Sequence, residues 1–132
     1  MIRIYQGIDV VAVEKVRGVG RRHERFLSDV FGEEERAYCF AQADPYTHLA
    51  GRFAAKEAAM KALGIGITGA GAGGGLGDVE VARHPSGQPT LTLSGWAAKV
   101  ARGLGVTQSS VSISHSEGVA VAAVVLVAAG EE

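Results

Sequence analysis

Charged side chains interrupt a segment that otherwise has the composition of a buried helix. Residues 45–63 are predicted to form one helix, with Pro45 at its first position and Gly64 after its last. Alanine, glycine and large apolar residues fill most of this segment, so we expect the helix to be largely buried. It nevertheless carries Arg52, Lys56, Glu57 and Lys61. Burying an unpaired charge costs on the order of several kcal/mol, so each must find a counter-charge, a metal or an anionic ligand.

Two interpretations of these charges are open. On a helical projection Lys56 lies within the apolar stripe, Arg52 flanks one edge, and Glu57 and Lys61 flank the other. Glu57 and Lys61 are one turn apart, so they could form a simple surface pair worth about 0.2–0.5 kcal/mol. Three cations with a single anion on an alanine-rich helix instead favour a functional site.

A second carboxylate stands at the end of the first predicted strand, residues 2–10. Asp9 follows apolar residues there, and such an aspartate by itself is often a cap for the next helix. Together with Glu57 it offers the hard oxygen ligands by which Mg²⁺ is held, alongside phosphate oxygens and water. The excess of arginine and lysine nearby indicates a polyphosphate ligand rather than a bare cation site.

His115 and a glycine-rich segment give weaker signals. Val111, Ile113 and His115 share one face of a predicted strand, where a single histidine is usually structural. Residues 64–77 contain eight glycines but lack the Walker pattern of a phosphate-binding loop. We interpret the glycines of residues 69–77 as flexibility and leave the role of that loop open.

The elements that must position these residues follow in an order typical of an α+β protein. We predict strands at residues 2–10, 78–84, 89–93, 109–116 and 119–127, and helices at 13–19, 21–27, 33–41, 45–63 and 94–104. Gly18 and Gly20 are expected to break the first helix, and Asp44 and Ser94 to cap the fourth and fifth. Residues 1–132 are predicted to form a single domain, with a frayed tail at 128–132.

Composition narrows the class of protein. The chain has 132 residues, 47% hydrophobic and 20% charged, which is typical of a globular domain. A net charge of −1 argues against binding to nucleic acid, although residues 15–25 form a local basic patch that could meet an acidic partner. The single cysteine excludes an intrachain disulfide and favours a cytoplasmic setting. We expect no signal peptide and no membrane span, because the apolar run at 119–129 is too short.

Three segments in order resemble the motifs of holo-acyl-carrier-protein synthases, the small trimeric type of 4′-phosphopantetheinyl transferase. Residues 7–11 (Gly-Ile-Asp-Val-Val) are similar to the first motif, and residues 111–116 with 120–122 to the last. The most specific is the middle one, Leu-Ala-Gly-Arg-Phe-Ala-Ala-Lys-Glu-Ala at 49–58, which continues as Lys-Ala-Leu-Gly at 61–64. The resemblance spans nearly the whole chain and implies the family fold, a mainly antiparallel sheet packed on a long central helix.

The resemblance also implies an activity. Enzymes of this family transfer 4′-phosphopantetheine from coenzyme A to a serine of apo acyl carrier protein and release adenosine 3′,5′-bisphosphate, with Mg²⁺ as cofactor. It implies that Asp9 and Glu57 hold the metal, that Lys61 contacts the pyrophosphate and helps the leaving group, and that all three are catalytic. Glu57, or water that it holds, is our candidate for the general base. The family forms homotrimers with active sites at subunit interfaces.

Further residues are implied for binding. The coenzyme A set is Arg52, Lys56, Lys61, Gly64, Gly66, Gly87, Pro89, His115 and Ser116. The carrier-protein set, which would grip an acidic helix, is Lys15, Val19, Arg22 and Arg25, and it coincides with the basic patch. The sequence leaves open whether the carrier serves fatty-acid or polyketide synthesis.

Some residues depart from the family pattern. The hairpin usually reads Asn-Gly-Lys/Arg-Pro, but residues 86–89 are Ser-Gly-Gln-Pro, so a cation that could meet a ligand phosphate is missing. Residues 43–44 replace a basic stretch of the relatives. Two other functions remain as alternatives: a non-catalytic module that binds coenzyme A or a nucleotide, and a structural trimer whose charged helix makes ion pairs between subunits.

Overall fold

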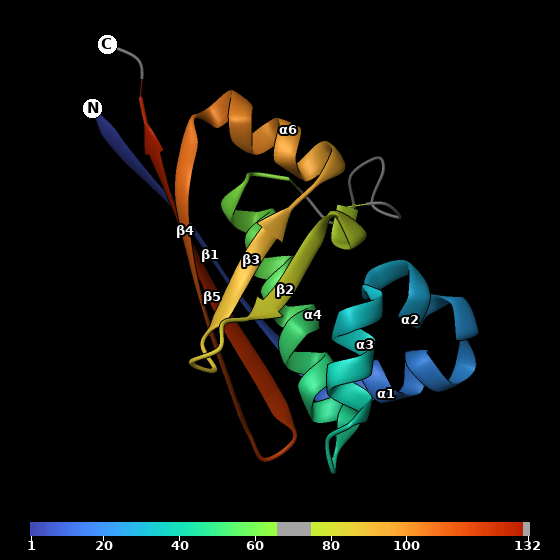
Figure 1. Ribbon diagram of the computed structural model, residues 1–132. Helices are drawn as coiled ribbons and strands as arrows, with labels where there is room; N and C mark the ends of the chain where they lie inside the picture. The colour runs from blue at the N-terminus through green and yellow to red at the C-terminus, as the bar shows by residue number, and fades with distance from the viewer. Residues whose placement is uncertain (66–74, 131–132) are drawn as a thin grey trace.

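The computed structural model describes residues 1–65 and 75–130, and Figure 1 shows how its elements are arranged. Their bounds are β1 (Ile2–Ala12), α1 (Val13–Arg22), α2 (Glu24–Val30), α3 (Glu33–Phe40), α4 (Pro45–Ala62), a 3₁₀ turn (Leu76–Asp78), β2 (Val79–Arg83), β3 (Pro89–Leu93), α6 (Gly95–Leu104), β4 (Val106–Ser116) and β5 (Val119–Ala129). Most of the predicted loop at 69–77 lies outside the described residues. None of the described helices is long and apolar enough to cross a membrane.

The strands form two antiparallel sheets. The larger has the order β1-β5-β4, so the last strand of the chain lies between the first strand and the fourth. A tight turn joins β4 to β5, and both of its central residues, Glu117 (φ 50°) and Gly118 (φ 82°), are left-handed, as a two-residue hairpin requires. The smaller sheet is the β2–β3 hairpin, whose β3 lies near β4.

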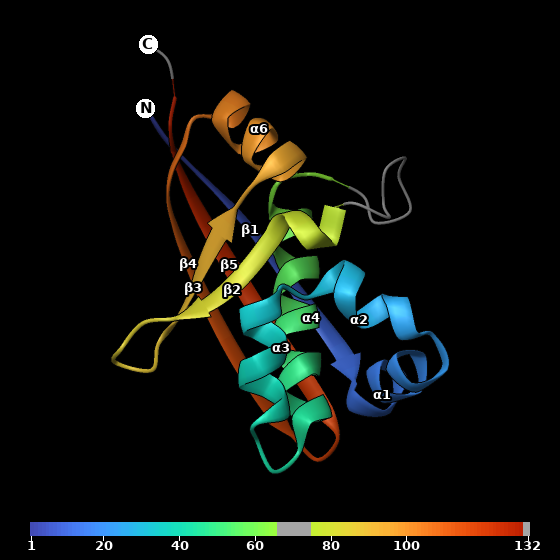
Figure 2. The same cartoon turned by 45° about the vertical axis from the view of Figure 1, so that its right-hand side comes forward.

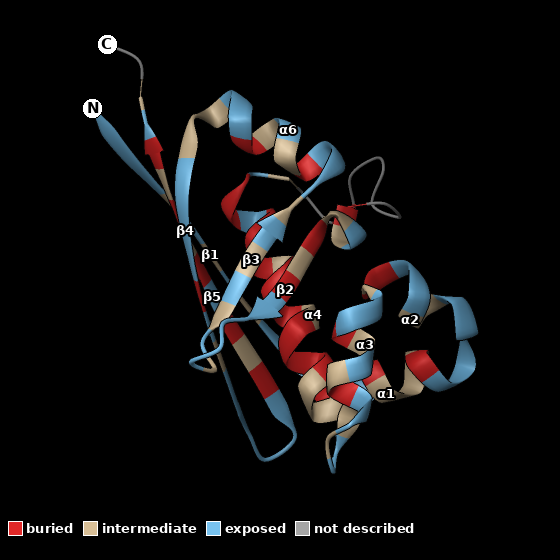
Figure 3. Ribbon diagram, in the orientation of Figure 1, coloured by how far each residue is buried: buried red, intermediate tan, exposed pale blue. Residues whose placement is uncertain are grey.

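Helix α4 runs through the middle of the molecule, with the larger sheet on one side and α1, α3 and β2 on the others (Figures 1 and 2). Figure 3 shows that most of its length is buried. Small residues permit this close packing, because a Cβ at Gly51 would lie only 2.8 Å from Ile113 Cγ2 of β4. The predicted α+β fold with a central helix on an antiparallel sheet is confirmed.

Strand β1 has two different faces. Its odd-numbered residues from Tyr5 to Val11 face α4, whereas Ile2, Ile4, Ile8 and Val10 point outward and are 70%, 66%, 60% and 63% exposed. Alternation of this kind normally places polar residues on the solvent side of a sheet. The outer face of β1 is therefore a large apolar surface that nothing in the described chain covers.

Several predicted boundaries are wrong. Helix α1 continues through Gly18 and Gly20 to Arg22, because Gly20 serves packing: a Cβ there would lie 2.9 Å from the Tyr46 ring. The break falls at His23, whose extended backbone separates α1 from α2, so α2 starts later than residue 21. The expected frayed tail begins too early, since residues 128 and 129 are paired with β1.

The predicted side-chain caps are also different. Ser94 occupies the N-cap position of α6, but its hydroxyl makes no cap bond. Asp78 caps this helix instead, because its Oδ2 accepts hydrogen bonds from the backbone N–H groups of Trp96 (2.8 Å) and Ala97 (3.4 Å). Asp44 precedes α4 as predicted, yet its carboxylate accepts from the Thr47 hydroxyl at 2.7 Å rather than from the backbone.

Candidate active site

A glycine brings β1 onto α4 and so fixes the position of the first carboxylate. A Cβ at Gly7 would lie 2.1 Å from the carbonyl oxygen of Ala58 and 3.0 Å from Lys61 Cβ. Only a residue without a side chain permits so close an approach of strand and helix. Asp9, two residues further along β1, projects from the same face and so meets the charged edge of α4.

The ammonium of Lys61 ties the two elements together. Lys61 Nζ donates to Asp9 Oδ1 and to the carbonyl oxygen of Ile8, both at 3.0 Å. The Asp9 side chain is 12% exposed and that of Lys61 49%. Asp9 Oδ2 is buried without a hydrogen-bond partner in the described part of the chain. Lys61 thus forms its ion pair with Asp9, across the contact between strand and helix. The surface-pair interpretation expected it to pair with Glu57 along the helix instead.

Glu57 lies beside this pair and has an unusual pKa. Burial, and then the adjoining Asp9 carboxylate, raise the pKa of Glu57 to about 8, while Lys61 and Lys15 oppose the rise. The Asp9 and Glu57 carboxylates therefore lie beside a single close ammonium, that of Lys61, and a second cation near them would be favourable. The described chain has no group of three or more side chains suited to a metal. A pair of carboxylates with an unsatisfied buried oxygen fits Mg²⁺, which keeps its other positions for water and phosphate.

A second group of the predicted residues lies elsewhere on α4. Arg52 is nearly buried, and its Cζ lies 4.5 Å from the ring centre of Tyr38 on α3. The His115 ring lies 5.9 Å from that of His48, which itself lies 5.9 Å from Tyr38. Ser116 and His115 line a cleft of about 400 Å³ with His48. Arg52, His115 and Ser116 are thus brought into one region.

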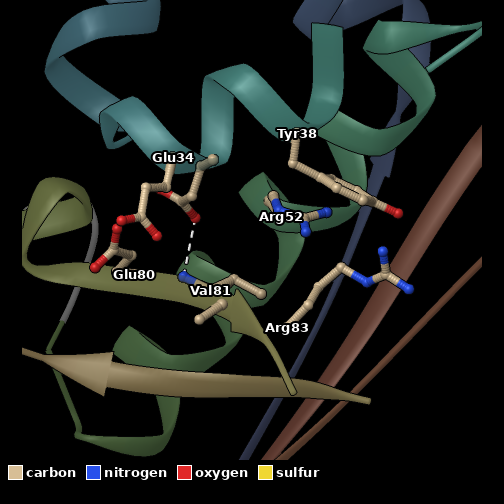
Figure 4. Close-up of a pocket in the computed structure, with 8 residues that line it drawn as sticks. Glu34, Tyr38, Arg52, Glu80, Val81 and Arg83 are labelled. Carbon is tan, nitrogen blue, oxygen red and sulfur yellow. Dashed lines mark hydrogen bonds between the residues drawn. The ribbon is translucent and has the colours of Figure 1, made fainter. Parts of the chain in front are cut away.

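This second group contains residues that the sequence analysis missed. Tyr38 and His48 lie between Arg52 and His115, and Arg83 of β2 places its Cζ 4.7 Å from the Tyr38 ring centre (Figure 4). His48 is one turn before Arg52 on the same helix, so helical spacing could have indicated it. No sequence signal joins Tyr38 or Arg83 to the group, because the contacts depend on how α3 and β2 pack on α4.

The structure does not place Lys56 where a ligand could reach it, so its predicted role in coenzyme A binding is wrong. Its side chain is 1% exposed, and Nζ donates to Glu35 Oε1 at 2.8 Å and to the carbonyl oxygen of Val79. Glu35 also accepts from the backbone N–H of Gly32 and of Val81, so both partners are satisfied. Burial lowers the pKa of Lys56, against the opposing effect of Glu35. This ion pair fastens α3 and β2 to α4.

The predicted glycines occupy turns. Gly64 follows α4 with φ 78° and has open space around its Cα, and Gly87 turns the β2–β3 hairpin with φ 95°. Pro89 is the first residue of β3. Gly66 lies outside the described residues.

The predicted carrier-protein residues lie on two consecutive helices, and those of α1 share one face. Lys15, Val19 and Arg22 follow one side of α1 at helical spacing, and Arg25 lies on α2. Lys15, Arg22 and Arg25 are exposed, and Val19 is half-buried. Lys15 also lies close enough to Glu57 to lower its pKa. The basic face therefore adjoins the Asp9–Glu57–Lys61 group.

The two groups on α4 face different directions. Glu57 follows Arg52 by five residues, which corresponds to a rotation of about 140° around the helix. The Asp9–Glu57–Lys61 group therefore faces β1, while the Arg52 group faces α3, β2 and His115. Arg52 and Lys61 line different pockets among the described residues.

Comparisons with known proteins place the chain in a family. A family model for the 4′-phosphopantetheinyl transferase superfamily matches residues 6–124, and the chain belongs to that superfamily. A holo-[acyl-carrier-protein] synthase of Anaeromyxobacter sp. (strain K) is 48% identical over 130 residues, covering 94% of this chain and 95% of its own. The family predicted from the three motifs is confirmed.

Solved structures agree with this assignment. The complex of the Chronobacterium ammoniagenes synthase with coenzyme A superposes with a TM-score of 0.84 at 29% identity, covering 97% of this chain and 99% of that one. The Helicobacter pylori holo-[acyl-carrier-protein] synthase in complex with coenzyme A gives a TM-score of 0.76 at 32% identity, covering 92% and 98%. The chain therefore matches nearly all of these two structures and shares their fold.

Proposed function

We propose that this chain is a holo-acyl-carrier-protein synthase, which transfers 4′-phosphopantetheine from coenzyme A to a serine of apo acyl carrier protein. The observation that carries the proposal is the Asp9–Glu57–Lys61 group at the contact of β1 with α4. The family model and the names and coenzyme A complexes of the relatives support it. Coenzyme A is then the co-substrate, and adenosine 3′,5′-bisphosphate the second product.

Asp9 and Glu57 would hold the Mg²⁺ ion, through the unpartnered Asp9 Oδ2 and the Glu57 carboxylate. The ion, when bound, would neutralise negative charge on the pyrophosphate. Lys61 holds an ammonium next to the same carboxylates and stabilises the charge that develops on the leaving phosphate. Without the metal ion, Asp9 and Glu57 have only the Lys61 ammonium close to them. A purely structural role therefore fits these two carboxylates poorly.

The transfer is a displacement at phosphorus. The serine oxygen bonds to the β-phosphorus of coenzyme A, and the bond from that phosphorus to the bridging oxygen of adenosine 3′,5′-bisphosphate breaks. Glu57 is the proposed base and takes the serine proton, directly or through a water molecule that it holds. Lys61 balances the charge left on the departing phosphate.

Apo acyl carrier protein is the expected macromolecular partner. The exposed basic face of α1 and α2 suits an acidic helix, and Lys15 lies between this face and Glu57. A carrier bound there would present its serine beside the carboxylates. The residues Lys15, Val19, Arg22 and Arg25 are proposed as the contacts, and the cytoplasm as the compartment.

Assembly into a homotrimer would complete the site. The two groups of one α4 face directions about 140° apart. Contact between the Asp9–Glu57–Lys61 group of one copy and the Arg52–His115 group of its neighbour would bring the two groups together. The apolar outer face of β1, with four large residues at least 60% exposed, supplies a surface for such an assembly.

Incubation with coenzyme A, Mg²⁺ and apo acyl carrier protein tests the proposal, with the carrier's intact mass as the readout. The carrier should gain the mass of one phosphopantetheine. The Glu57→Gln variant and EDTA should each abolish the gain, whereas Glu33→Gln, at an exposed position of α3, should not. A structural trimer or a non-catalytic binding module would leave the carrier mass unchanged with the native chain.

A further inference from the structure

A pocket between α3, α4 and β2 holds two guanidinium groups beside one aromatic ring. The pocket has a volume of about 220 Å³. The Cζ atoms of Arg52 and Arg83 lie 4.5 and 4.7 Å from the centre of the Tyr38 ring. Figure 4 shows both side chains directed toward Tyr38, with Glu34 and Glu80 at the far end of the pocket. One aromatic ring therefore contacts both cations.

Neither arginine has a carboxylate partner among the described residues. The ion pairs of the described chain involve Arg17, Lys56 and Lys61 instead. Glu35, the buried acid of the pocket, is fully occupied by Lys56 and two backbone N–H groups. A guanidinium keeps its proton under all ordinary conditions, so these two positive charges persist.

Arg52 contributes a buried donor to this pocket. Its side chain is only 7% exposed, and its Nε has no hydrogen-bond partner in the part of the chain that the structure describes. Leaving a buried charged donor unsatisfied is costly, whereas an anionic ligand would satisfy it. A buried donor beside a second free guanidinium indicates an anion-binding site.

Arg83 places the second guanidinium at the edge of the pocket, beside the β2–β3 hairpin. It ends β2 immediately before the hairpin turn, and a Cβ at Gly87 would lie 3.2 Å from its Nη2. Its guanidinium therefore rests against the turn that contains Gln88, and strand β2 supplies a positive charge at the hairpin.

We propose that Arg83 is a specificity-determining residue, and that Tyr38 positions it next to Arg52 so that both guanidiniums bind the 3′-phosphate monoester of coenzyme A. This inference rests on the proposed function. The ring attracts each guanidinium through its face and leaves the N–H groups free for phosphate oxygens. A dianionic phosphate neutralises two cations that otherwise repel each other.

Nucleotide binding to the full chain tests the inference without any transfer reaction. Calorimetry compares adenosine 3′,5′-bisphosphate with adenosine 5′-monophosphate, which lacks the 3′-phosphate. For Arg83→Gln we expect the Kd of the bisphosphate to rise about tenfold and that of the monophosphate by less than about twofold. For Arg83→Lys we expect an intermediate Kd for the bisphosphate, because lysine keeps the positive charge but cannot donate two parallel hydrogen bonds as a guanidinium does. Arg102→Gln, at an exposed position of α6, is the matched control and should change neither.

Kinetics then gives the second readout. The preference in kcat/KM for coenzyme A over dephospho-coenzyme A should fall about tenfold in Arg83→Gln and stay unchanged in Arg102→Gln. The inference is overturned if Arg83→Gln loses affinity equally for adenosine 3′,5′-bisphosphate and adenosine 5′-monophosphate, or if its kinetic preference for coenzyme A is unchanged. Transfer by the native chain would still uphold the proposed function in either case. A native chain that binds neither nucleotide and transfers nothing overturns both.

Discussion

The pKa of Glu57 makes the stability of the metal-free chain depend on pH in a way that one substitution removes. Burial and the Asp9 carboxylate raise this pKa from its usual value of 4.5 to about 8. Glu57 is therefore mostly protonated at neutral pH in the folded chain but ionised in the unfolded chain. The Glu57→Gln variant keeps the size of the side chain and cannot titrate.

The sign of the effect follows from the direction of the shift. Because the folded pKa lies above the unfolded one, the stabilisation is fully present below pH 4.5 and is lost as the pH rises through 8. The full shift corresponds to about 5 kcal/mol. Glu57 is only half-buried, so solvent screening reduces the expected change to about 2 kcal/mol.

Urea unfolding in EDTA at pH 5, 7 and 9 measures this contribution. We expect the free energy of unfolding of the native chain, minus that of Glu57→Gln, to fall by about 2 kcal/mol between pH 5 and pH 9. Groups that do not interact with Glu57 titrate equally in both proteins and cancel. Added Mg²⁺ at pH 9 should stabilise the native chain and not the variant. A difference that is flat across this pH range, or equal stabilisation of both proteins by Mg²⁺, would refute the reasoning about Glu57.

Three further predictions follow from the packing. Gly7→Ala should lower the free energy of unfolding by about 1–3 kcal/mol and reduce transfer, because the new Cβ overlaps the Ala58 carbonyl. Gly103→Ala, at a helical position with open space, is the control and should stabilise the chain slightly. Urea unfolding compares the two variants, and equal effects would contradict the close approach of β1 and α4. Lys56→Met and Glu35→Met should each cost about 3–5 kcal/mol, because each leaves a buried charge unpaired, and the double variant should cost less than the sum of the two. Urea unfolding measures these costs, and single costs below about 1 kcal/mol would show that the pair is not buried as described. Burial raises the pKa of the Cys39 thiol to about 11, so a disulfide reagent at pH 8 should modify Cys39 only when the chain unfolds. Rapid modification of the folded chain would contradict this burial.

Much of the fold could be predicted because the local signals agree with the global arrangement. Pro45 and Gly64 bound the long helix, and strand alternation gives every strand to within a few residues at either end. The errors occurred where a residue serves a distant contact. Gly20 makes room for Tyr46 rather than ending a helix, and Asp78 caps a helix that starts 17 residues later.

The site was predicted in part for the same reason. Asp9 and Lys61 meet because Gly7 permits it, and the motif around Glu57 identified the right helix. Lys56 was misassigned because its partner, Glu35, is 21 residues away on another helix. The role of Arg83 depends on a tertiary contact with Tyr38 that helical or strand periodicity does not encode.

The central claim is that the reaction needs the Asp9–Glu57–Lys61 group of one copy together with the Arg52 group of another. Mixing two inactive variants tests this claim most directly. Glu57→Gln and Arg52→Met should each be inactive alone. After the two are unfolded and refolded together in equal amounts, roughly a quarter of the sites in a random trimer would combine an intact Glu57 with an intact Arg52. We predict recovery of about that fraction of native transfer to the apo carrier. No recovery from a mixture that refolds into trimers would contradict the account.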